Sequence, residues 1–324
     1  MQSVSRIFRN VLSAVLLLAW SAVVVAATYP AKTVTFIVPF PAGGRTDLIA
    51  RIFAQQLPKH LGTTVVVVNK PGASGVLGAQ EVSQAPADGY TLGFFSTSIV
   101  TSQYTVATTI ALKEFEPISI INEDPAAIAV MESAPWKSLR ELVEFSRKNP
   151  GKLRMGMIPG ASAQIFAGGF AKAAGVQMVM VPFTGDSDGA LALAGGHIDV
   201  HVAVPVSYKA LVEARKIRML GVAAESRSAL YKDLPTFREN GVDLVIGSFH
   251  GVYAPKGTPA EALNAISSAL ERTVKSPELL DQMNLAGAGV VYVGRKDAAG
   301  YVARQDQTYK AVIQDLGMMT PAQK

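Results

Sequence analysis

The chain has 324 residues, a formal net charge of +5 and no cysteine. Without cysteine, no disulfide can stabilise the fold and no thiolate can bind a metal or attack a substrate. The basic residues are scattered rather than gathered into runs with aromatic residues, which argues against nucleic acid as a partner. A chain of this length is expected to bury a large core and to divide into two domains.

Residues 1–27 are predicted to be a secretory signal peptide. Arg6 and Arg9 precede an apolar stretch at 11–26, and the small residues Ala26 and Ala27 follow it. The alternative is a membrane anchor, for which the apolar stretch is short. Without the peptide, 28 Lys and Arg oppose 25 Asp and Glu, so the formal charge falls to +3. The mature chain is therefore expected to be a soluble periplasmic protein.

The remaining sequence alternates short apolar runs with stretches of helical periodicity, which is typical of an α/β fold with right-handed crossovers. Several runs are apolar on both faces, as in a parallel sheet covered by helices. Strands are predicted at 33–38, 65–69, 91–95, 118–121, 126–131, 153–157, 178–183, 199–204, 217–223 and 248–255. Helices are predicted at 46–60, 138–148, 163–174, 186–195, 259–275 and 296–316.

The first strand runs into the sequence VPFPAGGRTD (38–47) before a helix begins. Gly43 and Gly44 permit positive φ, so backbone amides can face outward, and Thr46 or Asp47 can cap the helix. Free amides and the helix dipole would suit a carboxylate. A plain strand–turn–helix connection explains the same residues, and the sequence alone leaves both interpretations open.

Three further polar junctions follow predicted strands. They contain Ser96 and Ser98 in FFSTS, Ser162 in GMIPGASAQ, and Thr184 and Asp186 in VPFTGDSDG. Ligands of open α/β sheets bind at the carboxyl ends of strands, so four such junctions indicate a binding site.

The sequence predicts no enzyme, cofactor or metal centre. Around Ser162, Gln164 replaces the last glycine of the G-x-S-x-G motif, which argues against a serine hydrolase. The glycines of residues 69–80 fit neither a dinucleotide fingerprint nor a phosphate-binding loop, and no histidine pair has zinc-site spacing. His201 is expected in the interior, and His250 is a candidate to line a cleft.

Seven stretches, taken in order across the chain, resemble the extracytoplasmic solute-binding proteins of tripartite tricarboxylate transporters, also called Bug proteins. They are Tyr29-Pro30, TVTFIVPFPAGGRTDLIAR, VVVVNKPGASGVLGA, ADGYTLGFFSTS, VPFTG…LAGGHID, IRMLGVAAESRS…LPTFRENG and GVYAPKGTP.

The resemblance implies a type II periplasmic-binding-protein fold, in which two α/β lobes joined by crossing strands close over a ligand. Lobe I would comprise residues 28–125 and 251–324, and lobe II residues 126–250. Such proteins bind small carboxylates or related solutes and pass them to a membrane permease. A sensing module for a receptor kinase and an exported hydrolase using Ser162 are the alternatives.

The ligand-binding residues implied by the resemblance lie on four loops. They are Phe40, Ala42, Gly43, Gly44, Thr46 and Asp47 on the first, Ser96 and Ser98 on the second, Gly160, Ala161 and Ser162 on the third, and Thr184 and Asp186 on the fourth. Arg45, Gln164 and His250 depart from the residues common in the family. Asp186 and Asp188 make the fourth loop acidic, which would favour a ligand bearing an amine or repel a second carboxylate.

Overall fold

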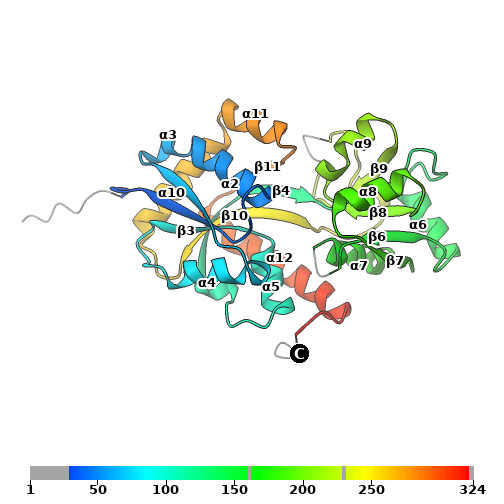
Figure 1. Cartoon of the computed structure of the whole chain (residues 1–324), viewed down its shortest axis with the longest axis horizontal. Helices are drawn as coiled ribbons and strands as arrows, with labels where there is room; N and C mark the ends of the chain where they lie inside the picture. Colours follow the sequence, from blue (N-terminus) through cyan, green and yellow to red (C-terminus); the bar gives the residue numbers. More distant parts are fainter. Residues whose placement is uncertain (1–28, 160–161, 228–230, 321–324) are drawn as a thin grey trace, which may run out of the picture.

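The chain folds into two lobes, each built on a β-sheet with helices packed against it (Figure 1). The computed structural model describes residues 29–159, 162–227 and 231–320. Two long strands, β4 (Phe115–Pro125) and β10 (Gly247–Pro255), pass between the lobes. The expected two-lobed α/β architecture with crossing strands is therefore confirmed. Within the described ranges, no helix combines the length and apolarity needed to cross a membrane.

The sheet of lobe I has six strands in the order β11-β4-β10-β3-β1-β2. Strand β1 (Val34–Val38) is parallel to β2 (Val65–Asn69) and β3 (Thr91–Ser96). Strand β10 is antiparallel to β3 and β4, and β11 (Val290–Val293) is antiparallel to β4. The sheet is mixed, although the buried β1 has the continuous apolar sequence of a strand covered on both faces.

Helices pack against this sheet, and the core of the lobe lies between the helices and the sheet. They are α2 (Arg45–Gln56), α3 (Pro58–Leu61), α4 (Val76–Gln84), α5 (Ser98–Thr105), α10 (Ala260–Val274), α11 (Pro277–Leu285) and α12 (Arg295–Asp315), with short 3₁₀ turns η1 (Ala73–Gly75) and η2 (Leu112–Glu114). The Phe94 ring lies 5.5 Å from that of Phe36 and 6.2 Å from that of Phe53, measured between centroids. This aromatic contact joins α2 to the sheet.

The sheet of lobe II has five strands in the order β7-β6-β8-β5-β9. The strands are β5 (Ala127–Met131), β6 (Arg154–Met157), β7 (Val179–Pro182), β8 (Val200–Ala203) and β9 (Ile217–Val222). Strand β6 is parallel to β7 and β8, whereas β5 is antiparallel to β8 and β9. The helices are α6 (Leu139–Lys148), α7 (Ser162–Ala174), α8 (Asp186–Ala194) and α9 (Lys209–Glu213), with 3₁₀ turns η3 (Pro205–Tyr208) and η4 (Arg238–Asn240).

The two crossing strands are packed tightly where they enter lobe II. Strand β10 pairs with β4 from Gly247 opposite Pro125 to Pro255 opposite Phe115, with register shifts on either side of Gly251 and Val252. A Cβ atom on Gly247 would lie 2.5 Å from the Asp124 carbonyl oxygen. Glycine is needed here because the two backbones approach too closely for a side chain.

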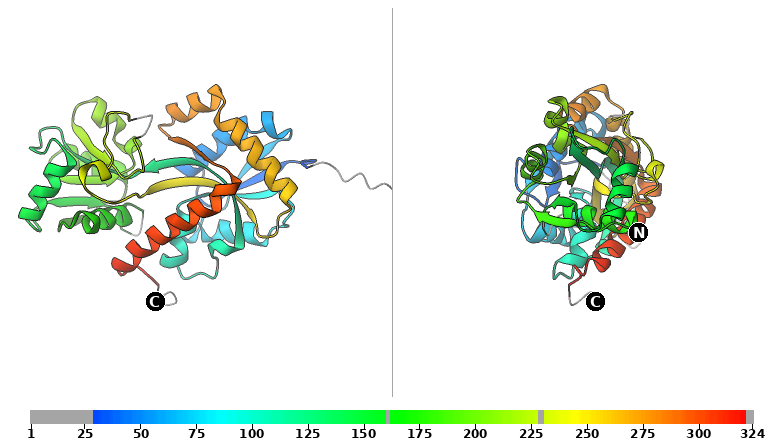
Figure 2. Two further views of the ribbon diagram at one scale, coloured as in Figure 1. Left: turned by 180° about the vertical axis from the view of Figure 1, so that it is seen from behind. Right: turned by 90° about the vertical axis from the view of Figure 1, so that its right-hand side faces the viewer.

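Helix α12 belongs to lobe I but also reaches lobe II (Figure 2). It packs against β4 and α5, and its last turns contact α7. Lys172 of α7 pairs with Asp315, and a Cβ atom on Gly168 would lie 2.4 Å from Leu316 Cδ2. The lobes are thus connected by this helix contact as well as by the crossing strands.

All ten predicted strands are present, with boundaries shifted by a few residues at most except at β4, which is longer. The short strand β11 and the helices α4, α5, α9 and α11 lie outside the predicted strand and helix ranges. The expectation that Thr46 or Asp47 caps the first helix is wrong, because the N-cap of α2 is Gly44 and no side chain caps it.

Candidate functional site

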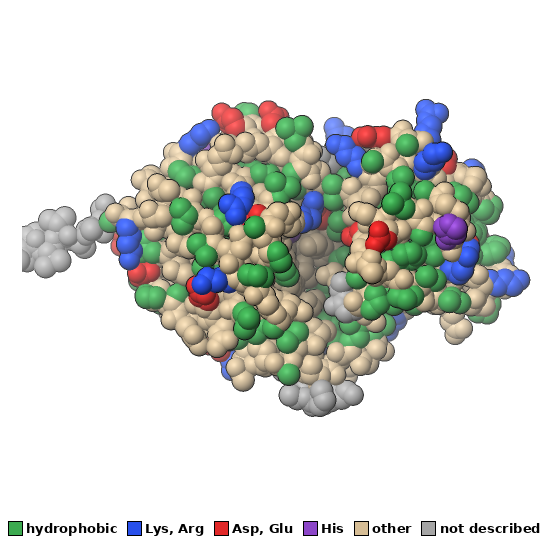
Figure 3. Space-filling model, in the orientation of Figure 1, with side chains coloured by type: hydrophobic (Ala, Val, Ile, Leu, Met, Phe, Trp, Pro, Cys, Tyr) green, Lys and Arg blue, Asp and Glu red, His purple; other side chains and the backbone are tan. Residues whose placement is uncertain are grey.

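A cavity of about 240 Å³ lies between the lobes, and Figure 3 shows the hollow in which the two halves face each other. Its walls come from the start of α2, the segment after β6, helix α7, the start of α8, the end of β8 and the start of β10. The lining residues are Arg45, Ile158, Ser162, Ala163, Phe166, Asp186, Ala203, Val204 and Ser248. A solute held there would contact both lobes.

The loop between β1 and α2 is held by the carboxylate of Asp47. Its Oδ2 accepts hydrogen bonds from the Gly43 backbone N–H (2.8 Å) and from Arg51 Nε (2.9 Å), and its Oδ1 accepts one from Asn69 Nδ2 (2.9 Å). Asn69 Nδ2 also donates to the Phe40 carbonyl (3.0 Å). Gly43 has a φ of +82°, which its lack of a Cβ permits. The side chain of Asp47 is therefore fully engaged within the loop.

These hydrogen bonds also fix the charge of Asp47, which is 2% exposed. Desolvation raises its pKa, but the hydrogen bonds from Arg51, Gly43 and Asn69, together with the charge of Arg51, outweigh it, so the pKa lies below its ordinary value. Asp47 is a stable anion that organises the loop.

The loop places the N-terminus of α2 at the cavity. Arg45 lines the cavity, and the backbone N–H groups of Arg45 and Thr46 have no acceptor within the described residues. Such free amides, with the positive end of the helix dipole, attract anions.

The guanidinium of Arg45 forms an ion pair with Asp124 on β4. Nη2 and Nε of Arg45 lie 2.5 and 3.1 Å from Asp124 Oδ2, and Nη2 also approaches the Gly287 carbonyl at 3.4 Å. Asp124 Oδ1 accepts from the Gly289 N–H (3.2 Å). Arg45 Nη1 has no acceptor within the described part of the chain, so it remains able to donate. Within the described chain, Arg45 is thus the only cationic side chain that lines this cavity, and Asp124 is its counter-ion.

His250 lies beneath this corner rather than in the cavity wall, and is 1% exposed. Its Nδ1 is 2.6 Å from Asn122 Oδ1, and its Nε2 is 3.1 Å from Thr46 Oγ1. Because Asn122 Oδ1 can only accept, Nδ1 carries the proton and Nε2 accepts from the Thr46 hydroxyl. Burial, aided by the charge of Arg45, lowers the pKa of His250 to about 3, so the imidazole is neutral. The hydroxyl of Thr46 is therefore used in this hydrogen bond.

The second predicted loop lies beside the first. Ser96 Oγ donates to Ser98 Oγ (3.1 Å), and a Cβ atom on Gly75 would lie 3.3 Å from Ser98 Oγ and 3.6 Å from Phe40 Cζ. Phe40 and Ser98 therefore converge on the 3₁₀ turn η1, while Ala42 is exposed on the first loop.

Lobe II contributes Ser162 and Asp186 to the cavity. Asp186 is the first residue of α8, and its Oδ2 accepts from Ser207 Oγ (3.3 Å). Its Oδ1 is buried and has no hydrogen-bond partner among the described residues. Burial raises the pKa of Asp186, and the bond from Ser207 offsets this only in part. The exposed Thr184 donates its hydroxyl to Asp188.

The two histidines of the described interior do not activate Ser162. His201 is buried with its Nδ1 3.1 Å from the Tyr208 hydroxyl, and burial lowers its pKa to about 4. Within the described residues, no hydrogen bond joins Ser162 to a histidine, and no cluster of three or more His, Asp or Glu residues has a geometry suited to a metal ion.

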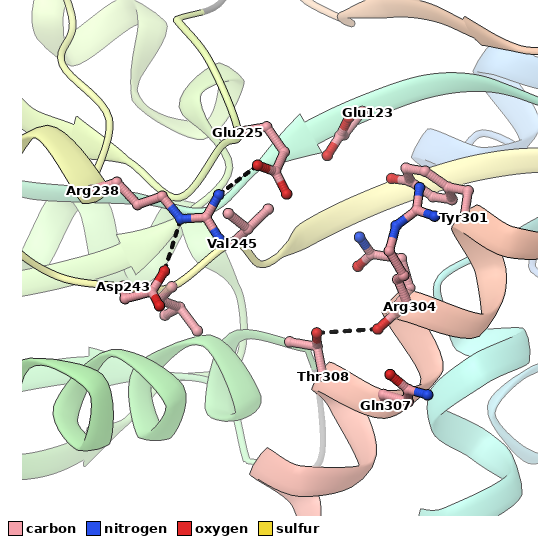
Figure 4. Close-up of a pocket in the computed structure, with 11 residues that line it drawn as sticks. Glu123, Glu225, Arg238, Asp243, Val245, Tyr301, Arg304, Gln307 and Thr308 are labelled. Carbon is pink, nitrogen blue, oxygen red and sulfur yellow. Dashed lines mark hydrogen bonds and ion pairs between the residues drawn. The ribbon is translucent and has the colours of Figure 1, made fainter.

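A second cavity, of about 430 Å³, lies between α12 and lobe II (Figure 4). Glu123 lines it, and because Glu123 and Asp124 are neighbours on β4, they point to opposite faces of the strand. Arg238 in this cavity is paired with both Glu225 (2.5 Å) and Asp243 (2.8 Å). Burial raises the pKa of Glu123, and the negative charges of Glu225 and Asp124 raise it further.

Of the residues predicted for the site, the structure places Ser162 and Asp186 in the wall of the interlobe cavity, with Arg45 opposite. Nine other predicted residues do not line this cavity: Phe40, Ala42, Gly43, Gly44, Thr46, Asp47, Ser96, Ser98 and Thr184. Gly160 and Ala161 lie outside the described residues. The apolar lining residues Ile158, Phe166 and Val204 were not predicted. Ile158 and Val204 directly follow strands and Phe166 lies near the start of α7, so their positions in the sequence could have indicated them.

Comparison with known proteins places this fold in a family. The model of the tripartite tricarboxylate transporter family receptor matches residues 49–318. The chain belongs to this receptor family. Its members are periplasmic solute-binding proteins, so the resemblance seen in the sequence is confirmed.

Three relatives illustrate the receptor family. A UPF0065 protein of Cupriavidus necator is 30% identical over 90% of this chain and 89% of its own length. A Polaromonas TctC solute-binding protein, solved without ligand, is 33% identical with a TM-score of 0.84, covering 89% of this chain and all of that one. An R. palustris protein solved with adipate is 29% identical with a TM-score of 0.71, covering 89% and 98%.

Proposed function

We propose that this receptor binds a small organic acid in the cavity between its lobes and delivers it, chemically unchanged, to the permease subunits of a tripartite tricarboxylate transporter. The observation that carries the proposal is the cavity itself, in which Arg45 of lobe I faces Ser162 and Asp186 of lobe II. A ligand that contacts both lobes stabilises their closed arrangement, because it binds that arrangement better than the open one.

The carboxylate of the ligand would bind at the start of α2. Arg45 Nη1 and the N–H groups of Arg45 and Thr46 supply donors there, and charge-assisted hydrogen bonds are the strong ones. The loop residues Phe40, Ala42, Gly43 and Gly44 would form the wall, with Asp47 fixing their geometry. Ser96, Ser98 and Thr184 would complete it after closure, together with Ser162, which already lines the cavity. The relative solved with adipate supports a carboxylate ligand.

The lobe boundaries proposed are 28–125 with 251–324 for lobe I, and 126–250 for lobe II. They are supported by the end of β4 at Pro125 and the start of β10 at Gly247, because all five strands of the second sheet lie between these two points. We also propose export to the periplasm with cleavage after residue 27, which the N-terminal sequence of the secreted chain would test.

Titration calorimetry with mono-, di- and amino-carboxylates tests the function, with small-angle scattering to follow closure. We expect one class to bind, to make the molecule more compact, and to be recovered unaltered. Absence of binding by every carboxylate, or chemical conversion of the bound acid, would contradict the proposal. Gly44→Val is the site variant, because a Cβ atom there lies 3.3 Å from the Pro41 carbonyl and the larger side chain would distort the loop. It should weaken binding without unfolding the protein.

A further inference from the structure

The side chain of Asp186 lines the interlobe cavity, and one of its carboxylate oxygens has no hydrogen-bond partner among the described residues. Its Oδ2 accepts from Ser207, whereas the buried Oδ1 lacks a donor among the described residues. A buried carboxylate oxygen without a donor costs free energy, because the hydration it lost on folding is not replaced. A small rotation of the carboxylate toward the cavity would let a hydrogen-bond donor on a bound ligand satisfy this oxygen.

The charges around the cavity also disfavour a second ligand carboxylate. Arg45 and Asp186 are the charged lining residues, and Asp124 pairs with Arg45 directly behind the wall. His250, beneath the same corner, is neutral and adds nothing. Two carboxylates thus oppose one guanidinium. A dicarboxylate would add two negative charges to a site that already carries a net negative one.

The helix dipole at the start of α8 does not offset this excess of negative charge. Its first turn contains Asp186 and Asp188, so the positive end of its dipole is already occupied by the protein's own carboxylates. The two ends of the cavity consequently differ: the α2 end presents a guanidinium and free amides, and the α8 end presents an acceptor. The rest of the wall is mostly apolar, with Ile158, Phe166 and Val204 beside the hydroxyls of Ser162 and Ser248.

We propose that the ligand of this receptor carries an ammonium group as well as a carboxylate, and that Asp186 binds the ammonium while the start of α2 binds the carboxylate. The inference rests on the proposed function and narrows its substrate class to amino-carboxylates with an apolar carbon skeleton. Asp186 is then the specificity-determining residue against simple dicarboxylates.

The test compares ligands that differ in one end group. Calorimetry at pH 7 would use ω-amino acids from 3-aminopropanoate to 6-aminohexanoate and the α-amino acid leucine. Each is matched to the dicarboxylate or the monocarboxylate of the same length, so 6-aminohexanoate is paired with adipate and with hexanoate. We expect at least one amino-carboxylate to bind roughly tenfold or more tightly than its matched acids, the factor that one charge-assisted hydrogen bond supplies.

Asp186→Asn removes the charge while keeping an acceptor for Ser207. We expect affinity for the amino-carboxylate to fall roughly tenfold to a hundredfold, and affinity for the matched dicarboxylate to hold or rise. Asp188→Asn is the matched control, because Asp188 lies in the same turn but is exposed and does not line the cavity. Because Asp188 contributes only indirectly to the charge at this end of the cavity, its replacement should change both affinities much less than Asp186→Asn does. The ligand-free Asp186→Asn protein should be more stable to urea at neutral pH, which shows that it folds.

Two results would overturn the inference. If dicarboxylates bind and no amino-carboxylate does, the receptor function stands and the assignment of Asp186 falls. If an amino-carboxylate binds equally well to Asp186→Asn and to the unaltered chain, Asp186 is not its partner. Binding of no carboxylate of any class would instead remove the proposed function and the inference together.

Discussion

Replacement of Asp47 by alanine should destabilise the protein even though the residue lies beside the ligand cavity. Asp47→Ala removes the acceptor of three hydrogen bonds, from Gly43, Asn69 and Arg51, at 2.8 to 2.9 Å. The hydrogen bonds from Gly43 and Asn69 are partly buried, and a donor left unsatisfied there costs about 1–2 kcal/mol. The side chain of Arg51 is 52% exposed, so water replaces its partner at little cost. The free energy of unfolding should fall by about 2–4 kcal/mol.

Urea unfolding of the ligand-free protein at pH 7, followed by far-UV circular dichroism, measures this loss. Arg51→Ala is the matched control, since it removes only the exposed partner, and should cost less than about 1 kcal/mol. Because the pKa of Asp47 is lowered in the folded state, its stabilisation is present above its ordinary value of 3.8 and lost as pH falls below it. The reasoning is refuted if Asp47→Ala costs no more than Arg51→Ala at pH 7.

Three other predictions concern the interior. Burial holds the pKa of His250 near 3 and of His201 near 4, so below pH 6.5 the unfolded chain binds protons that the folded chain does not. As the pH is lowered below 6.5, the free energy of unfolding should fall by about 1.4 kcal/mol per pH unit for each histidine. A urea midpoint that stays constant from pH 6.5 to 5 would contradict this. The pKa of Glu123 is raised, so its charge destabilises the fold as pH rises above 4.5; Glu123→Gln should raise the urea midpoint at pH 7 but not below pH 4.5. Gly247→Ala places a Cβ atom 2.5 Å from the Asp124 carbonyl oxygen and should cost about 1–3 kcal/mol, an effect that an unchanged urea midpoint would disprove.

The sequence pattern located the strands well because most of them are buried runs flanked by turn residues. It missed β11, whose four residues are all only partly buried and which lies at the sheet edge beside β4. It also suggested parallel sheets, since burial on both faces produces continuous apolar runs whichever way neighbouring strands point. Strand direction depends on the connections, as in β10, which returns from lobe II and pairs antiparallel with β3 and β4.

Local sequence identified the loops near the cavity but not what their side chains do. Asp47 accepts from Asn69, 22 residues away, and Arg45 pairs with Asp124, 79 residues away. These partners are brought together by the tertiary fold, which periodicity and turn signals do not report. Asp186 was recognisable as an acidic residue at a helix start, but its unused oxygen is visible only once the burial around it is known.

The contact of α12 with α7 has a mechanical consequence for how solutes enter. Because α12 joins the two lobes on the side that holds Glu123, we expect the lobes to separate on the other side, where Arg45 and Asp186 lie. We therefore expect a solute to enter and leave the cavity on the side of Arg45 and Asp186.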